Sequence, residues 1–124
     1  MAIERVPFRV ENAADIERAI GTFASMPNGG LLVPRDNTTL VHHNLVVALA
    51  AKYRLPAVYA LRVFVVNGGL MAYATHDVEI FRHAASYVDR ILRGAKPADL
   101  PVEAPIKYET ILNLKTAQAL VFRR

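Results

Sequence analysis

The first third of the chain interleaves short apolar runs with segments of helical spacing. From Ile3 to Val10, apolar and charged residues alternate at close to the two-residue period of a half-buried strand, so we predict a strand there. Asn12 is a candidate helix cap, and the apolar residues that follow recur at helical spacing as far as Pro27. Leu31 to Val33 is a short, wholly apolar run, which predicts a strand buried on both faces of a parallel sheet.

The middle of the chain repeats this alternation. A polar loop, Arg35 to Thr39, precedes a helix whose buried side begins at Leu40 and continues to Tyr53. Ala57 to Ala60 is predicted to be another interior strand. Leu61 to Val66 is apolar but too short to assign as helix or turn, and Leu70 to Ala74 is predicted to form a further strand after a glycine pair.

The last third contains the clearest helix. His76-Asp77 opens it, apolar residues recur on one face as far as Leu92, and Gly94 stands where a C-cap belongs. Lys96 to Pro105 contains three prolines and few apolar side chains, which favours an extended surface connector. We predict a final strand from Tyr108 to Leu112 and a short helix from Leu114 to Leu120.

Strands that alternate with helices predict an α/β fold: a three-layer, sandwich-like arrangement with a mainly parallel sheet, flanking helices and right-handed crossovers. In such sheets, ligands collect where the strands end at their carboxyl termini. These ends are predicted at Arg35 to Thr39, at Tyr59 to Arg62 and at Ala74 to Asp77.

Composition limits the possible functions. The 124 residues allow one domain, and 53% hydrophobic residues supply a core. The net charge of +4 permits weak attraction to polyanions without requiring it. Acidic residues interrupt the basic ones and no aromatic platform accompanies them, so we expect no nucleic-acid site. The basic residues in question are Arg82, Arg90, Arg93, Lys96, Arg123 and Arg124.

Residues for catalysis or cofactor binding are not found in convincing arrangements. The chain has no cysteine, which excludes disulfides, thiolate metal sites and a cysteine nucleophile. His42 and His43 are about 100° apart on a helix, and His76 and His83 are on the order of 10 Å apart, so neither pair suits a shared metal. The glycine pairs lack the spacing of a phosphate loop. We therefore expect no enzyme, no metal and no cofactor.

The sequence contains no apolar run of about 18 residues that would span a bilayer, and charges interrupt its start from Met1 to Glu11. We expect no membrane insertion and no export signal, so that the chain as given stays in the cytoplasm.

Asp36, Asn37 and Thr38 form the most informative polar cluster. A carboxylate, a carboxamide and a hydroxyl at the end of a parallel strand can hold the ammonium and polar groups of a small solute. The alternative is that these residues cap the following helix. Tyr59 and Tyr73 have a similar ambiguity, because each is either a core aromatic or the lining of an apolar pocket.

Two segments of the second half carry a family resemblance. Residues 87–103, which include the run Gly-Ala-Lys-Pro-Ala-Asp-Leu-Pro, and residues 108–117, which include Asn-Leu-Lys-Thr-Ala, closely resemble the C-terminal end of solute-binding proteins of ABC transporters. The resemblance is to the group that includes the aromatic amino-acid binders. Residues 56–59 and 68–73 look like the preceding segment of the same family, and residues 34–38 are similar to its ligand-side loop.

The resemblance implies one part of a larger protein, because family members are longer and have two α/β lobes that close on a solute. Residues 1–75 would form most of a second lobe of the type I periplasmic binding protein kind. Residues 76–124 would be a crossover segment that completes the first lobe and is a candidate for exchange between copies. One wall of the cleft would contain Asp36, Asn37, Thr38, Tyr59, Arg62, Tyr73 and Asp77.

The resemblance also implies a function: a truncated, non-catalytic solute-binding component that works with an ABC permease in the periplasm. On its own, the chain would bind a small amino-acid-like solute weakly or not at all, because half a cleft buries little of a ligand. The alternative is an assembly module with no ligand, a homodimer formed through residues 76–124.

Overall fold

The computed structural model describes residues 2–121, and Arg123 and Arg124 of the basic set lie outside the described residues. Four strands form one sheet in the order β1-β2-β3-β4. β1 (Leu31–Val33), β2 (Ala57–Tyr59) and β3 (Met71–Thr75) are parallel, and β4 (Tyr108–Leu112) is antiparallel to β3. The α/β class, the mainly parallel sheet and the flanking helices are confirmed.

The helices before β3 follow the predicted pattern. α1 (Ala13–Phe23) is capped by Asn12, whose side chain accepts a hydrogen bond from the Asp15 amide at 2.9 Å. The predicted helix over 40–53 is two helices, α2 (Asn37–Val41) and α3 (His43–Lys52), which meet at His42. The unassigned apolar run contains α4 (Arg62–Val66).

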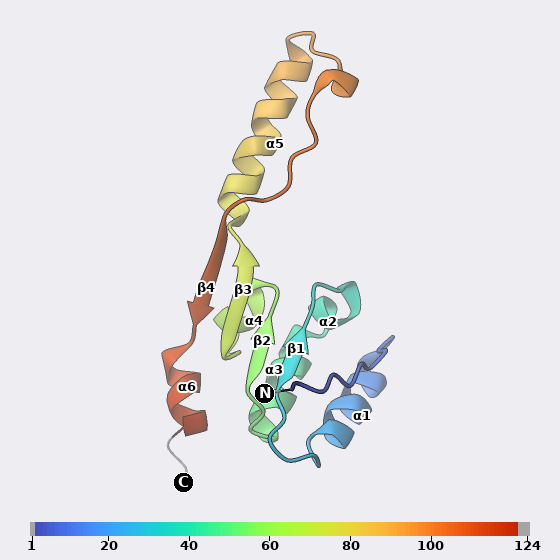
Figure 1. Ribbon diagram of the computed structural model, residues 1–124, viewed down its shortest axis with the longest axis vertical. Helices are drawn as coiled ribbons and strands as arrows, with labels where there is room; N and C mark the ends of the chain where they lie inside the picture. Colours follow the sequence, from blue (N-terminus) through green and yellow to red (C-terminus); the bar gives the residue numbers. More distant parts are fainter. Residues whose placement is uncertain (1, 122–124) are drawn as a thin grey trace.

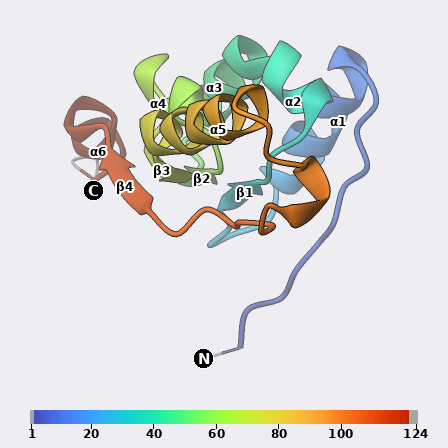
Figure 2. The same cartoon turned by 90° about the horizontal axis from the view of Figure 1, so that it is seen from above.

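One hydrophobic core joins α1, α3 and α4 to one face of the sheet (Figure 2). Ile16, Val46, Tyr59 and Phe64 are its largest fully buried side chains. The turn after α4 depends on glycine. Gly68 has a φ of +104°, and a Cβ at Gly69 would lie 2.6 Å from the Tyr59 ring.

The opposite face of the sheet, here called the open face, corrects one prediction. Leu31–Val33 was expected to be buried on both faces, but the side chain of Leu32 is 78% exposed. The reason is that no helix of the described chain packs against this face, which Figure 2 shows on the side away from α1, α3 and α4. A wholly apolar strand is compatible with burial on both faces of the sheet. Its sequence does not show whether a second layer of helices is present to cover the other face.

The predicted strand from Ile3 to Val10 is wrong. Residues 2–10 form neither helix nor strand, and only Val10 packs against the core. The alternating pattern is present, but a strand also needs a neighbour for its backbone hydrogen bonds, and none of the four strands pairs with this segment.

Residues 76–107, here called the arm, extend away from the sheet (Figure 1). α5 (Asp77–Leu92) continues the direction of β3, a short 3-10 turn (Pro97–Asp99) follows, and an extended connector returns beside the helix to β4. The long helix and the connector are confirmed. β4 and α6 (Leu114–Val121), which were grouped with the crossover segment, rejoin the sheet of residues 31–75.

Candidate functional site

The carboxyl ends of the three parallel strands meet at one edge of the sheet, here called the carboxyl edge. Residues 34–38 follow β1, residues 60–62 follow β2 and residues 76–77 follow β3. Parallel pairing brings these loops together, since all three strands run in the same direction. The arm leaves from the same edge (Figure 1), so the loops lie at its base.

Asp36 is a helix cap that stays open to solvent. Its Oδ2 accepts a hydrogen bond from the Thr39 amide at 3.0 Å, and the Thr39 hydroxyl donates to the Asp36 carbonyl at 3.1 Å. Asp36 and Asn37 are exposed and Thr38 is half-buried. Capping therefore holds the loop in one shape while its polar groups face outward, so the cap and a solute contact are compatible here.

Arg62 links the end of β2 to the returning strand. Its Nη1 lies 3.2 Å from Glu109 Oε1, and the arginine side chain is 58% exposed. Glu109 is a residue that the sequence reasoning missed. The sequence cue for Glu109 was a carboxylate within the predicted strand Tyr108–Leu112. In the structure it lies opposite the buried Ala74, on the face of the sheet that the helices cover. This ion pair places a guanidinium and a carboxylate at the carboxyl edge.

Tyr73 and Asp77 lie at the start of the arm. Tyr73 is on the open face, 58% exposed, and its ring stacks on Tyr108 with centroids 5.3 Å apart. Asp77 is exposed in the first turn of α5, where negative charge is favoured by the helix dipole. An aromatic face and a second carboxylate thus lie on either side of the point where the chain passes from β3 into the arm.

Tyr59 is placed apart from the other predicted residues. It is 1% exposed in the hydrophobic core, where it stacks on Phe64 with a centroid distance of 4.6 Å. Its hydroxyl has no hydrogen-bond partner among residues 2–121, and burial raises the pKa of this phenol to about 12. Its role in the fold is therefore packing beneath α4.

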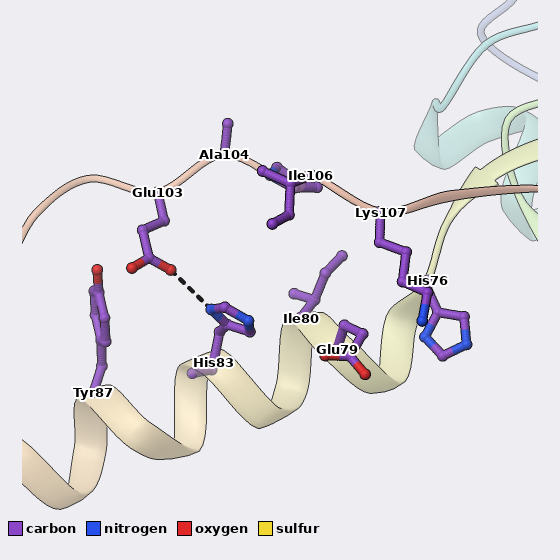
Figure 3. Close-up of a pocket in the computed structure, with 11 residues that line it drawn as sticks. His76, Glu79, Ile80, His83, Tyr87, Glu103, Ala104, Ile106 and Lys107 are labelled. Atoms are coloured by element: carbon purple, nitrogen blue, oxygen red, sulfur yellow. Dashed lines mark hydrogen bonds and ion pairs between the residues drawn. The ribbon is translucent and has the colours of Figure 1, made fainter.

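A second feature, which the sequence did not reveal, is a groove of about 360 Å³ between α5 and the connector (Figure 3). Ile80, Ala84 and Ile106 supply apolar lining, and the His83 Nδ1 lies 2.9 Å from Glu103 Oε2 across it. This hydrogen bond holds the pKa of Glu103 below its usual range. The Tyr87 hydroxyl donates to the Pro101 carbonyl at 2.5 Å, so these polar contacts tie the connector to the helix.

The chemistry at the carboxyl edge suits recognition of a small zwitterion. Carboxylates at Asp36 and Asp77 can accept from an ammonium, and the Arg62 guanidinium can donate to a carboxylate. No three His, Asp or Glu side chains among residues 2–121 are grouped so that they could hold a metal ion. In the same part of the chain, no helix has the length and apolar character needed to cross a membrane.

Solved structures share this architecture. A crystal structure of an ABC domain from Streptococcus pneumonia in complex with L-Trp matches 91% of the chain with a TM-score of 0.79 and 26% identity. A conserved domain protein from Vibrio cholerae matches 88% with a TM-score of 0.76 and 23% identity. The ligand-free, open structure of a substrate binding protein with adhesive properties from Clostridium difficile matches 93%, with a TM-score of 0.66 and 20% identity. The fold is thus that of one part of a periplasmic binding protein.

The family is established by sequence. The chain matches the family described as ABC transporter substrate binding protein over residues 1–123, and it belongs to that family. No curated protein is significantly similar to it. The chain spans 39%, 36% and 39% of the lengths of the three solved relatives, so it corresponds to well under half of each.

Proposed function

We propose that the chain is the solute-binding part of an ABC-type uptake system and acts by binding, without catalysis. The observation that carries this proposal is the family match across residues 1–123. The partners that follow from the family are a small solute and an ABC permease, and the compartment that follows is the periplasm. No cofactor is required, because recognition by charged and aromatic side chains is sufficient for this task.

The solute class we propose is an amino acid, with an aromatic one favoured. The relative from Streptococcus pneumonia was solved with L-Trp, and its identity to this chain is 26%. Asp36, Asn37 and Thr38 would hold the ammonium group, Arg62 would hold the carboxylate, and Tyr73 with Asp77 would border the side chain. The resemblance assigns Tyr59 to this wall as well. From its place in the core, Tyr59 would act by supporting α4, whose first residue is Arg62.

Binding by the isolated chain should be weak or undetectable. The carboxyl edge is a single wall, with most of its polar groups exposed. Closure of a second lobe over that wall would bury the solute and strengthen each polar contact. We propose that residues 1–75, together with β4 and α6, form most of the second lobe, and that the arm completes the first lobe.

A titration followed by amide chemical shifts tests the site. L-tryptophan at millimolar concentration is expected to shift amides of residues 34–38 and 60–62 weakly, without saturation. The Arg62→Gln variant is the matched test, since it keeps the side chain polar and should remove any shifts at residues 60–62. Shifts confined to the groove between α5 and the connector would contradict the assigned site.

A second candidate function is an assembly module in which two copies pair through residues 76–124. It is favoured by α5, none of whose residues is buried. Four apolar side chains of this helix recur at spacings of three, seven and four residues and are between 56% and 82% exposed: Val78, Phe81, Val88 and Leu92. A charge placed on this stripe by Leu92→Glu would then convert a dimer to a monomer in light scattering, whereas an unchanged mass would exclude this interface.

A further inference from the structure

β1 is an edge strand with an open outer side. It is the first strand in the sheet order and pairs only with β2, through registers that run from Leu31 opposite Ala57 to Val33 opposite Tyr59. Its outward backbone groups therefore face no strand within residues 2–121. Such an edge is a template for a further strand, which would complete the backbone hydrogen bonds.

An apolar row crosses the open face of the sheet from this edge. Leu32, Val58, Met71 and Leu112 are aligned by successive strand registers, so all four point to the same face. Leu32 at the edge is 78% exposed and Leu112 at the far end is 48% exposed. Native edge strands are commonly protected by shortness, by charge or by a covering element. β1 is short, at three residues, but it carries no charge and presents the large, exposed apolar side chain of Leu32.

Residues 3–10 have the alternating pattern of a strand, but they pair with none of the four strands. Ile3 is 79% exposed, and Val6 and Phe8 are 38% and 42% exposed. The segment is fixed near its end, where Phe8 lies edge-on to Phe23 of α1 with a centroid distance of 6.3 Å and Val10 packs on the core. Figure 2 shows it leading away from the sheet toward the side of the open face.

The topology assigns this segment to the β1 side of the sheet. α1 packs on the same face as α3 and α4, and right-handed crossovers on one face advance the strands in one direction, from β1 to β2 to β3. The segment that precedes α1 therefore belongs next to, or beyond, the open side of β1. Pro7 suits such a position, because an edge strand tolerates a missing backbone N–H.

The chain exposes more surface than a compact protein of its mass. The chain exposes 9376 Å², whereas a compact monomer of 13.7 kDa is expected to expose roughly 6,600 Å². The excess of roughly 2,800 Å² is well above the ~800 Å² that each partner contributes to a standard interface. The arm, which extends away from the sheet, contributes to this excess (Figure 1).

We propose that two copies of the chain exchange residues 3–10, each adding this segment as a strand to the β1 edge of the other. A second copy is favoured over an unrelated partner because each chain carries both halves of the contact: residues 3–10, which have a strand pattern but no neighbouring strand, and β1, whose outer side is unpaired among residues 2–121. Reciprocal exchange closes as a twofold dimer, with Glu11 as the hinge before the Asn12 cap of α1. This interface is independent of solute binding and of the α5 stripe.

Light scattering on the purified chain tests the exchange. The expected mass is twice 13.7 kDa at high concentration, with dissociation on dilution. Leu32→Glu and a deletion of residues 2–10 should each give a monomer. Leu92→Glu is the matched control, since Leu92 is 82% exposed, close to the exposure of Leu32, but lies on α5. It should leave the dimer unchanged.

Hydrogen exchange on the unmodified chain covers the case in which the variants fail to fold. Amides of residues 31–33 and of residues 3–10 should become protected together as the concentration rises. A wild-type chain that is monomeric at every concentration overturns the proposal. So does a dimer that only Leu92→Glu dissociates, or one in which residues 3–10 exchange equally fast at high and low concentration.

Discussion

Tyr73 and Tyr108 stack with their rings 10° from parallel and their centroids 5.3 Å apart. The first belongs to the last strand before the arm and the second to the first strand after it. Tyr73 lies opposite Thr110 and Tyr108 lies opposite Thr75 in the antiparallel register, so the pair is diagonal on the open face. The stack therefore ties together the two points where the chain leaves and re-enters the sheet.

Removing one ring of this pair should loosen the base of the arm. Tyr108→Ala is expected to lower the free energy of unfolding by about 1 kcal/mol beyond the loss of buried area, which is the usual value of an aromatic pair. Tyr108→Phe keeps the stack and should be close to neutral. Urea unfolding measures both variants, and equal losses in the two would show that the hydroxyl matters rather than the stack.

Two substitutions at Asp36 distinguish its role as a helix cap from a role in solute binding. Asp36→Ala removes the hydrogen bond to the Thr39 amide and should cost about 0.5–2 kcal/mol. Asp36→Asn keeps a capping oxygen and should retain most of that stability, but it removes the negative charge that would attract an ammonium group. Thermal unfolding checks the first effect. A stable Asp36→Asn variant that responds to solutes as the wild type does would argue against contact with the carboxylate.

Tyr59 should control part of the alkaline unfolding. Its pKa is about 12 in the folded protein against an ordinary value of 10.0, because burial penalises the phenolate. The stabilising contribution is therefore complete below about pH 10 and is lost as the pH rises toward 12. Tyr59→Phe should flatten the decline of stability in this window and be neutral or stabilising, by up to about 1 kcal/mol, at pH 7. In an alkaline titration followed by the ultraviolet absorbance of tyrosinate, Tyr59→Phe should lack the ionisation step at the highest pH. A titration curve unchanged from the wild type would contradict the burial of Tyr59 in the core.

Acid should release the connector from α5. The His83 hydrogen bond lowers the pKa of Glu103, so the folded arm favours the ionised carboxylate. The contribution is present above the ordinary glutamate pKa and disappears as the pH falls through the lowered value. Amide chemical shifts of residues 101–107 should move toward disordered-chain values at that point, and Glu103→Gln should show such shifts at neutral pH. Wild-type shifts in this variant would mean that the Tyr87 bond to Pro101 alone holds the connector.

The local signals in the sequence predicted much of the fold. The Asn12 cap and the regular spacing of apolar residues from Asp77 to Leu92 are short-range features, and both elements form as expected. The pattern of residues 3–10 was equally clear, yet a strand depends on a neighbouring strand that short-range spacing does not reveal. The same holds for Leu32, whose exposure depends on whether another layer covers the open face.

The candidate site was predictable in outline only. The rule that ligands gather at the carboxyl ends of parallel strands located Asp36 and Arg62 at one edge. Tyr59 could not be assigned to a face, because Ala57 and Val58 beside it are apolar and the run has no alternation to read. Glu109 was missed because its partner Arg62 is 47 residues away and only the antiparallel return of β4 brings the two together.

Calorimetric titration of the purified chain with L-tryptophan, L-phenylalanine and the branched-chain amino acids tests the central claim, that these residues form one wall of a two-walled solute site. We predict no saturable heat at micromolar concentrations of chain and solute, because the carboxyl edge is exposed and no other part of residues 2–121 forms an opposing lobe that would bury a ligand. A micromolar dissociation constant for any of these amino acids would contradict the claim and show that the 124 residues contain a complete site.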